Sequence, residues 1–214
     1  MNRGYGTTLV WIVLAIGLAG PAFAQDAERG RALYELCATC HGEQGEGNAL
    51  YLAPSIGGLP SWYVEQQLEK FRAGGRGTHF DDIPGMRMRP MALTLRNDRG
   101  DDLRDVTAYV ASLPVTKPPP LLTGGDAARG AGFYAVCQAC HGPAGEGVAA
   151  TNGPPLANQN DWYLLSSLER FKSGVRGSSP NDPNGAVMRG MAAVLPDEQA
   201  IKDVIAYIIS LSGK

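Results

Sequence analysis

Apolar residues recur along this chain with the spacing of an α-helix, and no stretch keeps the strict alternation typical of a strand. In the segment that starts at residue 61, for example, Val64, Leu68 and Phe71 share one helical face. Each half of the chain predicts three helices joined by long loops. The segments that we expect to be helical are 26–38, 61–74 and 98–112 in the first half, then a copy of the first segment, 161–174 and 197–211 in the second.

The second half of the chain repeats the first at a spacing of one hundred residues. Trp62-Tyr63 recurs as Trp162-Tyr163, and the register later slips by two, so that Tyr109 matches Tyr207. Such self-similarity indicates a duplicated structural unit. Between the copies, residues 114–125 hold a run of prolines and a pair of glycines, a composition typical of a short linker. We therefore expect one domain at 25–113, a linker at 114–125 and a second domain at 126–214.

The start of the chain has the features of a secretory signal peptide. Arg3 supplies a positive charge, Leu9 to Ala19 form an apolar run, and Ala22-Phe23-Ala24 fits the small-x-small cleavage pattern. The apolar run is shorter than a membrane span needs, although an uncleaved anchor is the alternative interpretation. We expect residues 1–24 to be removed and the mature protein to lie in the periplasm.

The charge of the chain argues against some classes of binding partner. The chain carries 19 basic and 21 acidic residues, for a formal net charge of −2. Neither half is strongly basic, so nucleic acids and anionic membrane surfaces are poor partners. Any association with a membrane would be peripheral and would pass through a protein partner.

The motif C-x-x-C-H occurs once in each half. Cys37, Cys40 and His41 form the first copy, and the second is Cys137, Cys140 and His141. This spacing is the one at which haem c attaches through two thioethers, with the histidine ligating the iron. A thioredoxin-like pair or a four-cysteine zinc site are alternatives, but neither explains a histidine after both pairs. The repeated motif predicts two covalently bound haem c groups, and export fits because bacteria attach this haem outside the cytoplasm.

A six-coordinate haem also needs a second axial ligand, usually methionine or histidine. The only other histidine is His79, and the second half has Ser179 at that position. Methionine is therefore favoured. The spacing leaves two candidates in each half, and these are Met88 or Met91 in the first and Met188 or Met191 in the second.

Taken together, these motifs resemble the two-domain dihaem cytochromes c of the cytochrome c-four family. The shared pattern is C-x-x-C-H-G, a proline before an apolar residue, a helix ending F-x-x-G-x-R, and a methionine before A-x-x-L. The resemblance implies an all-α fold of two tandem class I cytochrome c domains, each with three main helices around a haem. It also implies Met88 and Met188 as ligands. By the same resemblance, the carbonyls of Pro54 and Pro154 are expected to accept the proximal histidine N–H. The alternative is that these prolines only shape a loop.

Four further side chains are candidates for contact with the haems. Arg76 and Arg176 have the chemistry to pair with haem propionates, or they are solvated arginines at helix ends. Trp62 and Trp162 would donate to a propionate or wall the pocket. His79 we interpret as a surface residue.

Two filled axial positions predict outer-sphere electron transfer and no enzymatic activity. The resemblance favours a carrier between a quinol-oxidising complex and a terminal oxidase. The alternatives are an electron-accepting subunit of a dehydrogenase and, less favoured, a catalytic haem enzyme. The distal segments 78–87 and 178–187 differ in sequence, so we expect two different reduction potentials.

Overall fold

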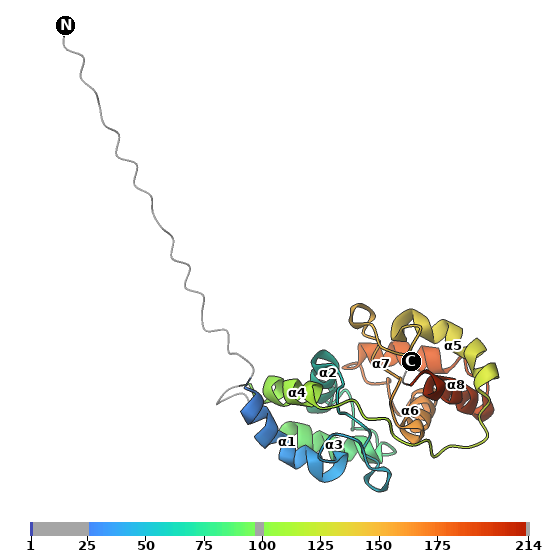
Figure 1. The fold of residues 1–214 in the computed structure, drawn as a ribbon, viewed down its shortest axis with the longest axis horizontal. Helices are drawn as coiled ribbons and strands as arrows, with labels where there is room; N and C mark the ends of the chain where they lie inside the picture. Colours follow the sequence, from blue (N-terminus) through green and yellow to red (C-terminus); the bar gives the residue numbers. More distant parts are fainter. Residues whose placement is uncertain (2–25, 97–100, 213–214) are drawn as a thin grey trace.

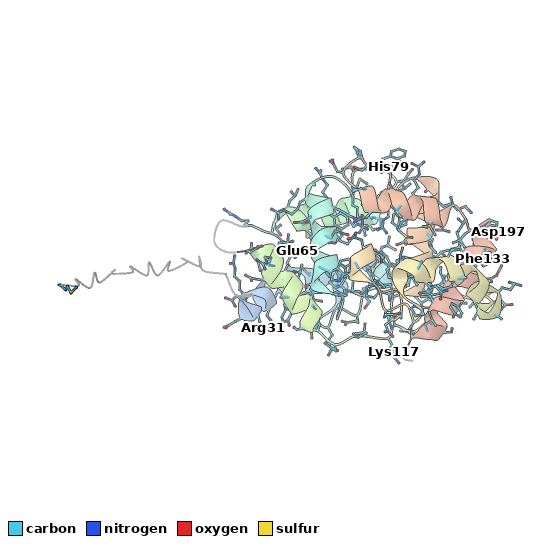
Figure 2. The ribbon with its side chains drawn as sticks, turned by 90° about the horizontal axis from the view of Figure 1, so that it is seen from above. Arg31, Glu65, His79, Lys117, Phe133 and Asp197 are labelled. Carbon is cyan, nitrogen blue, oxygen red and sulfur yellow. The ribbon has the colours of Figure 1, made fainter. Side chains whose placement is uncertain are left out.

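The protein is described by a computed structural model, in which residues 1, 26–96 and 101–212 are placed well enough to interpret. The predicted signal peptide, apart from Met1, lies outside these residues. The two halves of the chain form two helical bodies that lie side by side, coloured blue to green and yellow to red in Figure 1. The segment between them crosses one side of the molecule, where Figure 2 labels Lys117, opposite the loop of His79.

The described residues contain helices and no strands, and the two halves have the same order of elements. The first half comprises α1 (Ala27–His41), the short 3₁₀ helix η1 (Ala49–Tyr51), α2 (Ser61–Arg72), α3 (Ile83–Leu93) and α4 (Asp102–Ser112). The second comprises α5 (Ala127–His141), η2 (Ala149–Thr151), α6 (Asp161–Ser173), α7 (Pro183–Ala192) and α8 (Glu198–Leu211). The prediction of an all-α protein with two tandem domains is confirmed.

Among the described residues, each half has one more α-helix than the sequence pattern predicts. These helices, α3 and α7, carry the candidate methionines. Asp82 caps α3 by accepting from the backbone N–H of Gly85 at 3.2 Å, and Asp182 caps α7 in the same way. Pro84 stands in the first turn, where a proline costs nothing, whereas Pro90 lies inside the helix. Proline and glycine at these positions hid the helix from a reading based on periodicity.

The core of each half lies where its first helix crosses its last. Gly30 in α1 and Gly130 in α5 have no side chain, and a Cβ there would clash with the backbone carbonyl of Asp105 or Asp203. The close approach buries an aromatic residue of the first helix, Tyr34 or Tyr134, among the aliphatic residues of the last. The C-terminal ends of α1 and α5, which carry the cysteines and the histidine, lie beyond this crossing and face the loops.

The two halves meet through α2 and α6, which are repeats of one another. Lys70 Nζ in α2 lies 2.7 Å from Asp182 Oδ1, and Arg170 Nε in α6 lies 3.8 Å from Asp82 Oδ1. The same pairing is thus made twice, once in each direction across the interface. Among the described residues, no helix is both long and apolar enough to cross a membrane.

Candidate haem sites

The proximal histidines are the last residues of α1 and α5, and both are buried. His41 Nδ1 lies 2.8 Å from the carbonyl oxygen of Pro54, and His141 Nδ1 lies 2.8 Å from that of Pro154. Burial lowers the pKa of both imidazoles, although the hydrogen bond to the proline carbonyl opposes the shift. The rings are therefore neutral at pH 7. A neutral ring that donates from Nδ1 leaves Nε2 with a free lone pair for a metal.

The cysteines have no feature of a redox-active pair. Burial raises the pKa of Cys37 to about 11, and it raises that of Cys137 as well. Thiols that exchange disulfides are instead activated by a lowered pKa. The described residues also hold no cluster of three or more histidine, cysteine or carboxylate ligands. The thioredoxin and zinc interpretations therefore lose support.

A cavity in the second half brings most of the candidate residues of that half together. Its lining includes Cys137, Cys140 and His141 from α5, Pro154 from the following loop, and Met188 from α7. Aliphatic side chains form much of the remaining wall, among them Leu156, Leu164, Leu168, Val204 and Ile208. An apolar cavity that has thiols and an imidazole on one wall and a thioether on another matches a covalently attached, axially ligated haem.

The structure keeps both methionine candidates near the iron site. Met188 and Met191 are three residues apart on α7, and both line the cavity. In the first half, Met91 is 42% exposed, whereas Met88 is only partly exposed. The lower exposure of Met88 agrees with its choice as the ligand of the first half. In the second half, the cavity lining alone does not distinguish Met188 from Met191.

The two arginines lie together at the interface between the halves, where Arg176 is buried and Arg76 is partly buried. The guanidinium of Arg76 lies 4.4 Å from the ring centroid of Phe71, and that of Arg176 lies 4.2 Å from Phe171. Each donates one hydrogen bond within its own half, to Gln67 at 2.7 Å or to Ser167 at 3.0 Å. The Nε atoms of both arginines are buried without a partner.

Tyr63 and Tyr163 both lie beside these arginines, and burial raises the pKa of Tyr63 to about 12. Burial raises the pKa of Tyr163, but Arg176 and Arg76 lower it and prevail, so that it falls to about 8. Two neighbouring guanidinium groups whose Nε–H donors are buried and unpaired can bind an anion in addition to the nearby Asp82. Haem propionates are such anions, and the residues present therefore fit the group.

The tryptophans have a different environment from that of the arginines. Trp62 packs edge-on against Tyr63, with ring centroids 5.8 Å apart, and Trp162 packs against Tyr163 at 6.1 Å. Both indoles are partly exposed, and Trp162 is absent from the lining of the cavity in its own half. The structure thus places the tryptophans beside the site and leaves the propionate contact without support. His79 lies on the surface, stacked on Phe80 at 4.6 Å (Figure 2).

Sequence reasoning missed the contribution of one half to the site of the other. Tyr63, Gln66, Gln67 and Lys70 of α2 form part of the wall of the cavity in the second half. The repeat of Tyr63 as Tyr163 was the one available signal, because an identical aromatic in both copies suggests a shared role. The sequence pattern does not indicate that Tyr63 contacts the cavity of the other half.

The repeated order of helices and the repeated C-x-x-C-H sites define a protein of two tandem cytochrome c domains. The sequence model of the cytochrome c family matches residues 27–114 and 127–212, so the chain belongs to this family. Among its relatives, cytochrome c4 of Azotobacter vinelandii is 30% identical over 213 residues, which cover 96% of this chain and 97% of that protein. The thiosulfate dehydrogenase electron acceptor of Stutzerimonas stutzeri (strain A1501) is 34% identical over 186 residues, 80% and 78% of the two chains.

A solved structure agrees with these relatives. The crystal structure of reduced recombinant cytochrome c4 from Pseudomonas stutzeri superposes with a TM-score of 0.67 at 30% identity, covering 86% of this chain and 98% of that one. The protein is thus a cytochrome c4-like dihaem electron-transfer protein. Cys37 with Cys40 and Cys137 with Cys140 fit the attachment of its two haem c groups.

Proposed function

We propose that this protein is a periplasmic carrier that passes single electrons between respiratory redox partners, such as a quinol-oxidising complex and a terminal oxidase. Each haem c, when bound, supplies an iron that cycles between the ferric and ferrous states. The observation that carries the proposal is the duplication of the site residues, because both halves hold a buried histidine bonded to a proline carbonyl and a helix that carries methionines.

In this proposal the residues of the chain have distinct roles. His41 and Met88, and likewise His141 and Met188, hold the iron from both sides and exclude other ligands. The carbonyls of Pro54 and Pro154 fix the orientation and the tautomer of the imidazoles. Arg76 and Arg176 bind propionates at the interface, where their unpaired Nε atoms lie.

The arrangement of the domains also supports relay within the molecule. We assign residues 25–113 and 126–214 to the two haem domains and 114–125 to the linker, with 1–24 as a cleaved signal. Because α2 of the first domain walls the cavity of the second, a haem bound in that cavity would lie beside the first domain. An electron that arrives in one domain would then have a short path to the other.

Carbon monoxide tests the carrier function. We expect the reduced, haem-loaded protein to resist carbon monoxide and peroxide, since methionine occupies the position that these ligands need. A spectroelectrochemical titration should resolve two potentials, because the distal segments differ in sequence. Rapid ligand binding by either haem would exclude the carrier function, and a titration with two identical, independent sites would exclude the difference in potential.

A second candidate is an electron acceptor for a periplasmic dehydrogenase. It is favoured by the similarity to the thiosulfate dehydrogenase electron acceptor of Stutzerimonas stutzeri. Stopped-flow spectroscopy separates the two candidates when the oxidised protein is mixed with that organism's thiosulfate dehydrogenase plus thiosulfate, or with its quinol-oxidising complex plus quinol. Faster reduction by the quinol-oxidising complex supports the carrier, and faster reduction by the dehydrogenase supports the acceptor.

A further inference from the structure

The first half of the molecule exposes far more large apolar side chains than the second. Leu50 is 90% exposed, Leu93 54%, Tyr51 51% and Met86 37%. These residues belong to η1 and α3, which are linked by a hydrogen bond of 3.3 Å from Arg87 Nη1 to the carbonyl oxygen of Tyr51. Isolated exposed apolar residues are ordinary, but several on two linked elements indicate an interaction surface.

The same positions are small or polar in the second half. The copy has Ala150 in place of Leu50, Ala186 in place of Met86, and Ala193 in place of Leu93. The alanines are also exposed, so the backbone presents both surfaces in the same way. On α7 the second half exposes Val187, at 62%, but it has alanine at all three positions that carry Leu50, Met86 and Leu93 in the first half. Since the cores of the two halves are alike, packing does not explain this difference.

This surface adjoins the haem cavity without forming its lining. In the second half the neighbouring positions Thr151, Val187 and Met191 line the cavity, whereas Ala150, Ala186 and Ala193 do not. By the repeat, Leu50, Met86 and Leu93 stand outside the cavity of the first half, around its rim. We call these three residues the apolar rim. A bound haem therefore leaves the apolar rim exposed.

The charge beside the apolar rim is positive. Met86, Arg89, Pro90 and Leu93 follow one another at helical spacing on α3, and all four are exposed. Residues 83–93 contain Arg87 and Arg89 and no carboxylate, whereas the copy at 183–193 contains only Arg189. The face is therefore apolar and basic, although the protein as a whole has a net charge of −2.

We infer that the apolar rim, with Arg87 and Arg89, is the surface on which this protein docks a redox protein whose own docking face is apolar and acidic, and that electrons cross to that partner at the first haem. Apolar burial holds the complex and charge complementarity guides the approach. The inference rests on the proposed carrier function and adds to it which domain faces the acidic partner.

The test uses electrodes that reproduce the chemistry of the partner. Gold is coated with a mixed monolayer of methyl-terminated and carboxylate-terminated thiols, and a second electrode carries methyl and ammonium groups. The haem-loaded protein is compared with a variant that combines Leu50→Ala, Met86→Ala and Leu93→Ala, the residues of the second copy. A matched control combines Val115→Ala, Leu121→Ala and Val194→Ala, which are 60%, 59% and 55% exposed and lie elsewhere.

We expect the protein to adsorb on the carboxylate film at least about tenfold more tightly than on the ammonium film. The rim variant should lose about tenfold or more of this affinity, with the control within about twofold. Arg89→Gln should weaken binding only at low salt. Equal affinity of rim variant and control, or preference for the ammonium film, overturns the docking surface. Reversible voltammetry of the same samples with dissolved mediators reports the carrier function separately.

Discussion

The carboxylate of Asp203 accepts hydrogen bonds from three residues at the crossing of α5 and α8. It accepts from the backbone N–H of Asp126 at 2.8 Å, from Gln199 at 2.9 Å, and from Arg129 Nε at 2.8 Å. The Arg129 hydrogen bond, helped by the other donors, holds the pKa of Asp203 well below its usual range against the effect of burial. In the first half, Asp105 accepts in the same way from the backbone N–H of Asp26. One carboxylate per domain thus ties the last helix to the start of the first.

Asp203→Asn should therefore destabilise the protein in a pH-dependent way. A depressed carboxylate pKa stabilises the fold above the unfolded value of about 3.9, and this contribution is lost as the pH falls through the folded value. The melting temperature of the variant should lie below that of the parent at pH 7, and the difference should narrow as the pH falls below about 4. Arg129 is largely exposed, so salt should narrow the difference. A difference in melting temperature that stays constant with pH would contradict a stabilising role for the charge of Asp203.

Single substitutions also identify which methionine ligates the iron of the second haem. Met188→Ala should abolish the far-red absorption that is typical of methionine bound to ferric haem, lower the potential of one haem, and admit carbon monoxide to it. Met191→Ala is the matched control, because it removes the other methionine of the same cavity, and it should leave all three observables in place. If the two variants exchange these results, Met191 is the ligand.

At the scale of helices, the two glycines of α5 make a paired test of packing. A Cβ at Gly130 meets the carbonyl of Asp203, whereas one at Gly132 meets no atom within 4 Å. Gly130→Ala should cost about 1–3 kcal/mol of unfolding free energy, since α5 and α8 must move apart. Gly132→Ala should instead stabilise by about 0.5–1 kcal/mol, because alanine suits a helix interior better than glycine. Chemical denaturation measures both, and equal effects would show that the crossing tolerates a side chain.

The same scale shows what could be predicted from the sequence. The two crossing pairs, α1 with α4 and α5 with α8, were predicted as helices, because helical periodicity and the repeat agree there. The helices α3 and α7 were missed, because Pro90 or Gly190 interrupts the local signal and the caps at Asp82 and Asp182 stabilise the helices from outside them. The cysteines and proximal histidines were found because covalent attachment fixes their spacing. The place of Tyr63 and Lys70 in the second cavity was not predicted, because it depends on how the two halves dock.

At the scale of the whole molecule, the interface is asymmetric despite the repeat. Residues 159 and 160 reach across it, where Asn160 Oδ1 accepts from the backbone N–H of Ser55 at 2.6 Å and Gln159 Nε2 donates to the Ser55 carbonyl at 2.9 Å. The equivalent positions in the first half are Leu59 and Pro60, which make no such contact. This contact holds the loop after Pro54, whose carbonyl orients His41. The second domain thus supports the proximal side of the first haem site.

Asn160→Ala should separate the two domains and disturb the first haem more than the second. The variant leaves the N–H of Ser55 buried without an acceptor, which costs about 1–3 kcal/mol. Gln66→Ala is the control for calorimetry, because Gln66 also bonds across the interface, to Asn152 at 3.2 Å, but in an exposed position where water replaces the lost contact. Calorimetry should show a second, lower transition for Asn160→Ala alone, and a redox titration should show one shifted potential. Because Ser55 directly follows Pro54, a shift confined to one haem would show that docking of the domains, and not the local sequence alone, sets the environment of the proximal histidine. A single unchanged transition with both potentials unmoved would mean that the two domains behave as independent cytochromes joined by a linker.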